Sequence, residues 1–246
     1  MVIGLLGAIG AGKSTVAKLL ADEGAEVVDA DRLAHEVLCS GEGRGAIVGR
    51  FGAAILGQDG EVDRRLLAQR VFGDAAALQD LNAIVHPPVL RAIQERIERH
   101  RKREKALDTA GDQAVLALDV PLLAETPLES ECDALLFVDA SPEVRAARLR
   151  ERGWSSDEAA RREAFQPLLP KKRASADVIV DNSGPLAATR IHVRDALRQL
   201  GLRAGRTRSQ ESPKQKPAPR PTSDDSEPTR PESERPGRSN QDRKVQ

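Results

Sequence analysis

Residues 7–14 combine glycines, a lysine and a hydroxyl at the spacing of a phosphate-binding loop. Gly7-Ala-Ile-Gly-Ala-Gly12-Lys13-Ser14 matches the pattern G-x-x-x-x-G-K-[ST]. Glycines let backbone N–H groups approach a phosphate, and the helix that follows adds the positive end of its dipole. We expect Lys13 to reach the β- and γ-phosphates of a nucleoside triphosphate and Ser14 to ligate Mg²⁺. The predicted nucleotide-binding residues of the loop are Gly10, Ala11, Gly12, Lys13, Ser14 and Thr15.

Carboxylates stand at the ends of two predicted strands, where an open α/β sheet gathers its ligands. Asp119 ends an apolar run in the manner of a Walker B strand, and we expect it to hold the metal through water. Asp31 can serve Mg²⁺, accept a proton from an acceptor hydroxyl, or cap the helix predicted from Arg32. Because Asp29 lies two residues earlier, one Asp can also take each role.

Arginines cluster toward the C-terminal part of the chain, at Arg145, Arg148, Arg150, Arg152, Arg161 and Arg162. Guanidinium groups stabilise the negative charge that spreads over the oxygens during phosphoryl transfer. Arg148 and Arg152 are four residues apart and share one helical face, so we expect them on a mobile lid that closes over the phosphates. For the other arginines, a solvated basic face is the favoured interpretation.

Five short apolar runs predict strands, namely Val2–Leu6, Glu26–Asp29, Val115–Asp119, Ala134–Val138 and Asp177–Val180. Their near-continuous apolar character is typical of parallel strands covered on both faces. Helical patterns separate them: one after the phosphate loop that stops at Gly24, a long one following Pro87 and Pro88, and those over Pro142–Glu151, Ser156–Leu168 and Leu186–Leu200. This alternation predicts an α/β fold with a five-stranded, largely parallel sheet.

Two segments depart from this regular alternation. Roughly 85 residues separate the second strand from the third, far more than one crossover helix needs, so we expect a mostly helical substrate-binding insertion over residues 32–114. Residues 203–246 contain only three apolar residues and seven of the 15 prolines. Such a segment cannot bury enough apolar surface to offset its ordering entropy, and we predict a disordered tail.

Composition excludes several classes of protein. The formal net charge is zero, which disfavours a uniformly basic nucleic-acid clamp, so no nucleic-acid partner is expected. No stretch approaches the roughly 20 apolar residues of a membrane helix, so no membrane partner is expected either. Cys39 and Cys132 make no disulfide framework, which favours a reducing, cytoplasmic setting. The oligomeric state is not predicted.

The phosphate loop leaves several functions open. We find no guanine-reading Asn-Lys-x-Asp after a late strand, which disfavours a GTPase switch, and the size fits a small-molecule kinase. The acceptor of such a kinase can be a nucleoside, a nucleotide or a shikimate-like compound. A nucleotide-gated scaffold that uses the tail, or a tail that tethers an enzyme to an anionic surface, are weaker alternatives.

The motifs taken together resemble the dephospho-CoA kinase family over about residues 1–200. Beyond the phosphate loop, the resemblance rests on Asp29-Ala-Asp31, Phe51-Gly52, Asp59-Gly60, Asp63-Arg64, Val71-Phe72, His86-Pro87, Pro121-Leu-Leu with Glu125, Arg148, Arg152, Arg162, Gln166, Lys172 and the run Ala176–Gly184. Departures from the family pattern at Ala8, Asn82, Arg145 and Glu163 spare Lys13, Ser14, Asp31 and Arg148.

The resemblance implies transfer of the γ-phosphoryl group of ATP, with Mg²⁺, to the ribose 3′-hydroxyl of dephospho-CoA. Asp31 aligns with the family's proposed general base, and Lys13, Arg148 and Arg152 supply positive charge. Arg64 and His86 match positions of the CoA domain. Arg64 can hold a substrate phosphate, whereas His86 either contacts substrate or braces the helix after Pro87.

The resemblance also implies a fold: a P-loop core like that of nucleoside-monophosphate kinases, with a helical CoA domain and a lid. We therefore expect a kinase domain over residues 1–202, followed by the tail over 203–246. Within the domain we expect the core over about 1–31 and 115–202, the helical region over about 32–114 and the lid over about 143–172.

Overall fold

Five parallel strands form one sheet in the computed structural model, which describes residues 1–106, 114–121, 123, 126–155, 158 and 169–202. The strands are β1 (Val2–Gly7), β2 (Glu26–Asp29), β3 (Leu116–Asp119), β4 (Ala134–Asp139) and β5 (Val178–Asp181). Their order is β2-β3-β1-β4-β5, and every pairing is parallel. All five predicted strands are confirmed to within one residue at each end.

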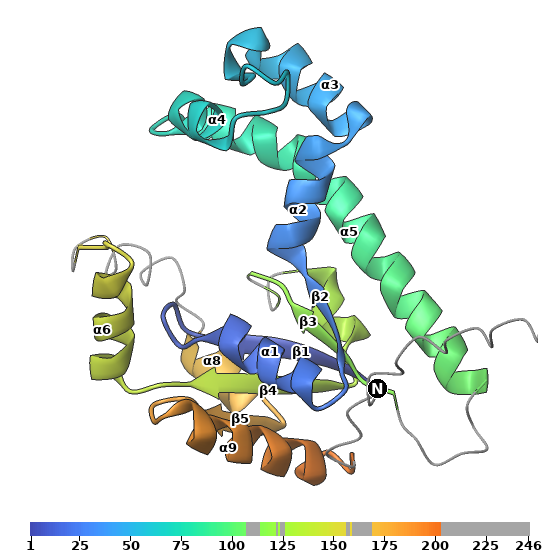
Figure 1. The fold of residues 1–246 in the computed structure, drawn as a ribbon. Coiled ribbons are helices and arrows are strands. Elements are labelled where there is room, and N and C mark those ends of the chain that lie inside the picture. Colours follow the sequence, from blue (N-terminus) through green and yellow to red (C-terminus); the bar gives the residue numbers. More distant parts are fainter. Residues whose placement is uncertain (107–113, 122, 124–125, 156–157, 159–168, 203–246) are drawn as a thin grey trace, which may run out of the picture. The chain divides into compact units, whose positions relative to one another are not determined.

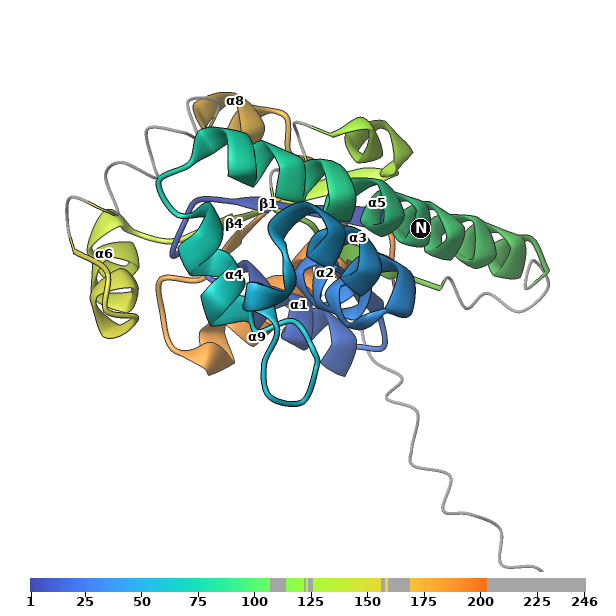
Figure 2. The same ribbon diagram turned by 90° about the horizontal axis from the view of Figure 1, so that it is seen from above.

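Side chains alternate across the central strand β1 and divide the core into two clusters. Ile3 and Leu5 pack with α1 (Lys13–Asp22) and α9 (Leu186–Gln199), which cover one face of the sheet (Figure 2). Val2 and Leu6 pack on the other face with apolar residues of the helical segment between β2 and β3. The central strand β1 is therefore buried on both faces, as the apolar runs predicted, whereas the edge strand β5 leaves Ile179 exposed.

The interval between β2 and β3 is helical, as predicted. It contains α2 (Ala30–Cys39), α3 (Gly41–Phe51), the 3₁₀ turn η1 (Ala53–Ile55), α4 (Arg64–Val71) and α5 (Ala75–Ala106). Side-chain caps begin all four of these α-helices; at α3, Ser40 accepts from the Gly43 N–H at 3.0 Å, and at α4, Asp63 accepts from the Arg65 N–H at 2.8 Å. The helices α2, α3 and α4 each contact α5, which runs the length of this region (Figure 1).

The helix predicted after Pro87 and Pro88 is present, but its predicted start is wrong, because α5 begins at Ala75 and passes through both prolines. Two prolines inside a helix remove two N–H donors and crowd the preceding turn. Apolar side chains lie buried on both sides of them, Val85 before and Val89 and Ile93 after, in the same core cluster. Packing along this whole stripe therefore outweighs the local cost of the prolines.

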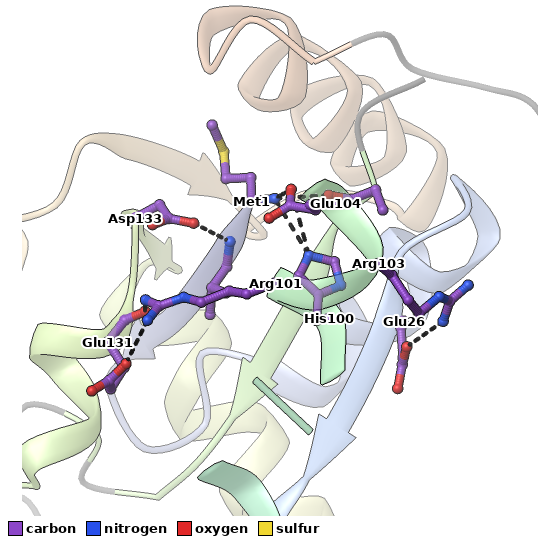
Figure 3. Close-up of polar contacts among 10 residues, drawn as sticks. Met1, Glu26, His100, Arg101, Arg103, Glu104, Glu131 and Asp133 are labelled. Carbon is purple, nitrogen blue, oxygen red and sulfur yellow. Dashed lines mark hydrogen bonds and ion pairs between the residues drawn. The ribbon is translucent and has the colours of Figure 1, made fainter. Parts of the chain in front are cut away.

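Polar contacts join the C-terminal end of α5 to the edge of the sheet where β1 begins (Figure 3). The Met1 amine donates to the Ala114 carbonyl at 2.8 Å and contacts Glu104 and the buried His100. Two ion pairs flank this contact, Arg101–Glu131 at 3.0 Å and Arg103–Glu26 at 3.5 Å. They fix the direction in which α5 leaves the sheet.

The segment after β4 carries α6 (Pro142–Glu151), which the structure confirms residue for residue, and α8 (Leu169–Ala174) precedes β5. Ser141 caps α6 by accepting from the Val144 N–H at 3.4 Å. A short 3₁₀ helix η3 (Pro127–Glu131) precedes β4. Among the earlier predictions, the helix over 156–168 falls almost entirely outside the described residues, and the disordered tail over 203–246 does so completely.

Candidate active site

The phosphate loop leaves β1 and enters α1 with the backbone that such a loop requires. Gly10 and Gly12 have φ of 78° and 90°, in the left-handed region that side chains disfavour. Gly12 precedes the first residue of α1, and the helix has no side-chain cap among the described residues. The N–H groups and dipole of its first turn are therefore available to an anion.

Behind the loop, two side chains converge on one backbone carbonyl. The Ala11 oxygen accepts from Nη1 of Arg148 at 3.1 Å and from Nδ2 of Asn182 at 2.7 Å. The second guanidinium nitrogen, Nη2 of Arg148, donates to the Asn182 carbonyl at 2.8 Å. Arg148 thus lies against the phosphate loop and connects α6 to the turn after β5, and its role as lid charge stays a prediction.

In front of the loop, a lysine and a carboxylate lie close together in a half-buried setting. Burial lowers the pKa of Lys13, while the charges of Asp119 and Asp31 act to raise it. Burial raises the pKa of Asp119, opposed by the Lys13 charge and by a hydrogen bond from Ser14. The structure therefore brings Lys13, Ser14, Asp119 and Asp31 together at the carboxyl ends of β1, β2 and β3.

The two aspartates after β2 have different surroundings. Asp29 caps α2, because its Oδ1 accepts from the Arg32 N–H at 3.0 Å. Asp31 is an exposed residue of the first helical turn. The question of which aspartate is the cap is thereby answered, and the Asp31 carboxylate is available for another role.

A pocket of about 170 Å³ opens beside Asp31. Its lining comes from α2, α5 and the chain after β3, and it includes Asp31, His86, Val89, Val120 and Pro121. The pocket is mostly apolar with few polar groups, as in a site for part of a small molecule. Asp31 lines this pocket and also acts electrostatically on Lys13 of the phosphate loop.

The remaining predicted residues lie elsewhere. Arg64 is the exposed first residue of α4 and does not line the pocket that contains Asp31 and His86. Arg152 follows the last residue of α6 and is exposed, whereas Arg148 packs against the loop. Thr15 lies in the first turn of α1. Arg161, Arg162 and Gln166 lie outside the described residues.

Sequence reasoning did not anticipate the contact of Asn182 with the phosphate loop, nor any role of Thr189. Both are buried, and Thr189 donates to the Asn182 side chain at 2.9 Å. The available signal was a polar residue on the buried face of a helix, since Thr189 shares that face with Val193. Lys172, also buried, acts on the pKa of Lys13 from α8.

This combination of a five-stranded parallel sheet, a phosphate loop and a helical segment between β2 and β3 defines a P-loop kinase of the nucleoside-monophosphate-kinase type. The model of one family, described as dephospho-CoA kinase, matches residues 1–188. The chain belongs to the dephospho-CoA kinase family.

Relatives and solved structures agree with this placement. A dephospho-CoA kinase of Streptomyces avermitilis is 44% identical over 204 residues, which cover 82% of this chain and 95% of the relative. The dephospho-CoA kinase of Leifsonia xyli is 42% identical over 204 residues, which cover 82% of this chain and 98% of the relative. The crystal structure of TT1252 from Thermus thermophilus aligns with a TM-score of 0.63 at 34% identity, over 81% of this chain and 97% of that one. The structure of a dephospho-CoA kinase from Campylobacter jejuni has the same fold. It aligns with a TM-score of 0.60 at 21% identity, over 81% of this chain and 96% of that one.

Proposed function

We propose that this protein transfers the γ-phosphoryl group of ATP to the 3′-hydroxyl of the dephospho-CoA ribose, the final step of coenzyme A synthesis. Membership of the family supports the overall reaction. The observation that carries the residue-level proposal is the position of Asp31, which lines an acceptor pocket and acts on Lys13 of the phosphate loop. One carboxylate is thus positioned to serve both the acceptor hydroxyl and the phosphate site.

Asp31 is the proposed general base. An acceptor hydroxyl in the pocket would donate a hydrogen bond to this carboxylate, which orients the oxygen for in-line attack and takes up its proton. Lys13 neutralises the β- and γ-phosphates, and Arg148, held against the loop by its carbonyl contacts, supplies further positive charge there. His86 lies across the same pocket, and we propose that it contacts the acceptor.

The residues beside the loop fit a hydrated Mg²⁺. Ser14 and Asp119 supply a hydroxyl and a carboxylate that are already hydrogen-bonded to each other. Among the described residues, no three His, Cys, Asp or Glu side chains form a ready-made metal cage, which suits an ion held largely by water and substrate phosphates. Bound Mg²⁺ supplies positive charge that neutralises the phosphates. Asp119 would hold it through water.

We assign the parts of the chain accordingly. The core over about 1–31 and 115–202 binds ATP, the helical region over about 32–114 receives dephospho-CoA, and residues of about 143–172 form the lid. We place Arg64 in contact with a substrate phosphate after closure, and Arg152 with the nucleotide.

The proposed setting is the cytoplasm, where both cysteines stay reduced; Cys39 and Cys132 are free thiols. No described helix has the length and apolar character needed to cross a lipid bilayer.

The acceptor is tested by incubating the purified chain with ATP and dephospho-CoA, then with adenosine, nucleoside monophosphates and shikimate in separate reactions. We expect turnover with dephospho-CoA to exceed that with the other acceptors by orders of magnitude. Preferential phosphorylation of a nucleotide would overturn the proposed acceptor.

The base is tested with Asp31→Asn, which keeps the size of the side chain and removes its proton affinity. We expect kcat to fall about 10²- to 10⁴-fold while the Kd for ATP changes little. Asp29→Asn is the matched control, since it removes a charge two residues away and Asn still caps a helix. Equal losses in the two variants would show that Asp31 is not the base.

A further inference from the structure

Two polar side chains at the start of the last helical segment are buried although neither takes part in the steps above. Asn182, in the turn after β5, is 2% exposed, and Thr189, in α9, is fully buried. A buried polar group costs free energy unless it is hydrogen-bonded, so each must have a defined partner. The partners form a short relay that ends at the phosphate loop.

The relay runs in one direction. The Thr189 hydroxyl donates to Oδ1 of Asn182 at 2.9 Å, and Nδ2 of Asn182 donates to the Ala11 carbonyl at 2.7 Å. An amide side chain has an acceptor end and a donor end that are nearly the same shape. The Ala11 carbonyl can only accept, so it selects the orientation that presents Nδ2 to it, and the Thr189 hydroxyl holds the other end of the amide by donating to Oδ1.

The backbone around Asn182 is fixed independently. Its N–H donates to the Asp139 carbonyl at 2.8 Å, which ties the turn to the end of β4. The Ser183 hydroxyl donates to Asp181 at 2.6 Å and accepts from the Ser141 N–H at 2.9 Å. The turn that carries Asn182 is therefore attached both to the sheet and to the beginning of α6.

Fixing the Ala11 carbonyl also fixes the next N–H. A trans peptide is planar, with its C=O and N–H pointing in opposite directions. With the Ala11 oxygen held by Asn182 and Arg148, the Gly12 N–H is directed away from them. A Cβ on Gly12 would lie 2.3 Å from Nδ2 of Asn182, so the relay also dictates glycine at this position.

We propose that Asn182, held in place by Thr189, is a positioning residue for nucleotide binding. It holds the Ala11–Gly12 peptide so that its N–H faces the phosphates, and its carbonyl seats the guanidinium of Arg148. This role of Asn182 rests on the proposed function for the identity of the reaction. Its main test measures nucleotide affinity and does not involve the acceptor.

The test compares Thr189→Val, which removes the hydroxyl at similar volume, with Thr189→Ser, which keeps it. ATP affinity is measured by calorimetry without acceptor, and the thermal midpoint of each variant is recorded in parallel. Losing the hydrogen bond from Thr189 that holds the Asn182 amide against the loop should raise the Kd for ATP about three- to tenfold in the Val variant. The Ser variant should stay within about twofold of the parent by the same reasoning.

Asn182→Asp provides a second variant that keeps the contact with Thr189 and replaces the donor with a carboxylate oxygen facing a carbonyl. We expect a larger loss of ATP affinity, with KM for ATP raised and KM for dephospho-CoA unchanged. This variant decides the matter if Thr189→Val does not fold. Parental ATP affinity in Asn182→Asp, or equal losses in the Val and Ser variants, would overturn the proposal whatever acceptor the enzyme uses.

Discussion

Gly12 is the residue of the phosphate loop with the least room for a side chain. Its φ of 90° disfavours any L side chain, and a Cβ would lie 2.3 Å from Asn182. At Gly10 the φ of 78° is similar, but the nearest atom to a Cβ, the Arg145 carbonyl oxygen, would be 3.1 Å away. The two glycines therefore share the conformational cost of substitution and differ in the steric one.

We predict that Gly12→Ala weakens ATP binding more than Gly10→Ala does. The left-handed backbone alone costs about 1–2 kcal/mol, which corresponds to about 5- to 30-fold in the Kd for ATP if the loop must return to this conformation. Gly12→Ala adds the displacement of Asn182. Calorimetric titration with ATP measures the Kd of each variant. A Gly10 variant that binds ATP as weakly as the Gly12 variant would contradict this ranking.

At the same scale, the sequence predicted which residues surround the phosphates but not how they are held. Lys13, Ser14, Asp31 and Asp119 meet because strand ends meet at one edge of a parallel sheet, which is a property of the fold class. The contact of Asn182 with Ala11 spans 171 positions in the chain and depends on the orientation of one amide. Spacing motifs carry no information of that kind.

Among the elements, α3 illustrates how one helix can contain glycines with opposite roles. A Cβ on Gly49 would meet no atom within 4 Å, and this residue lies exposed in the helix interior. A Cβ on Gly43 would lie 2.0 Å from the Val37 carbonyl, where α3 packs against the end of α2. Only the second glycine is required by the packing.

We predict that Gly49→Ala stabilises the protein by about 0.5–1 kcal/mol, because alanine loses less backbone entropy than glycine on entering a helix. Gly43→Ala should destabilise it through the steric contact. Urea denaturation measures the free energy of unfolding, which should rise in Gly49→Ala and fall in Gly43→Ala. Because Gly49 is exposed and does not line the pocket beside Asp31, we expect turnover to stay unchanged in Gly49→Ala. Destabilisation by Gly49→Ala would refute the prediction.

Element boundaries were predictable where local signals and packing agree. Ser141 and Pro142 mark the start of α6 by capping and ring geometry, and the helix begins there. Pro87 and Pro88 carry an equally clear local signal, yet α5 continues through them. The difference lies in Val85 and Val89, which enter one core cluster from both sides, and such long-range packing is not visible in a local pattern.

At the scale of the whole molecule, α5 connects the pocket beside Asp31 with the beginning of β1, the central strand of the sheet. His86 lines the pocket beside Asp31, and about four helical turns later His100 lies buried where β1 begins. The packing at this second position therefore determines where the helical region stands relative to β1. The stability of the contact around His100 should matter to the folding of the entire chain.

His100 makes this contact sensitive to acid. Its pKa is lowered, chiefly by burial and then by the Met1 ammonium, while Glu26 acts in the opposite direction and Arg103 adds to the lowering. Glu104 lies 3.7 Å from the ring. Since the folded pKa lies below the ordinary value of 6.5, the unfolded chain binds the proton more readily than the native one as pH falls below 6.5.

We predict that the free energy of unfolding falls as pH decreases from 6.5 toward the folded pKa, by at most about 1.4 kcal/mol per pH unit for this single proton. Above pH 6.5 the contribution of the neutral ring is fully present. His100→Gln cannot take up the proton, so its deficit in stability relative to the parent chain should shrink between pH 7.5 and about 5.5. Urea denaturation of both chains across this range isolates the histidine from the carboxylates, which titrate in both. If the difference in unfolding free energy between the two chains stays constant with pH, the acid sensitivity has another source. If the difference shrinks as pH falls, protonation of His100 at the contact between α5 and β1 destabilises the folded chain.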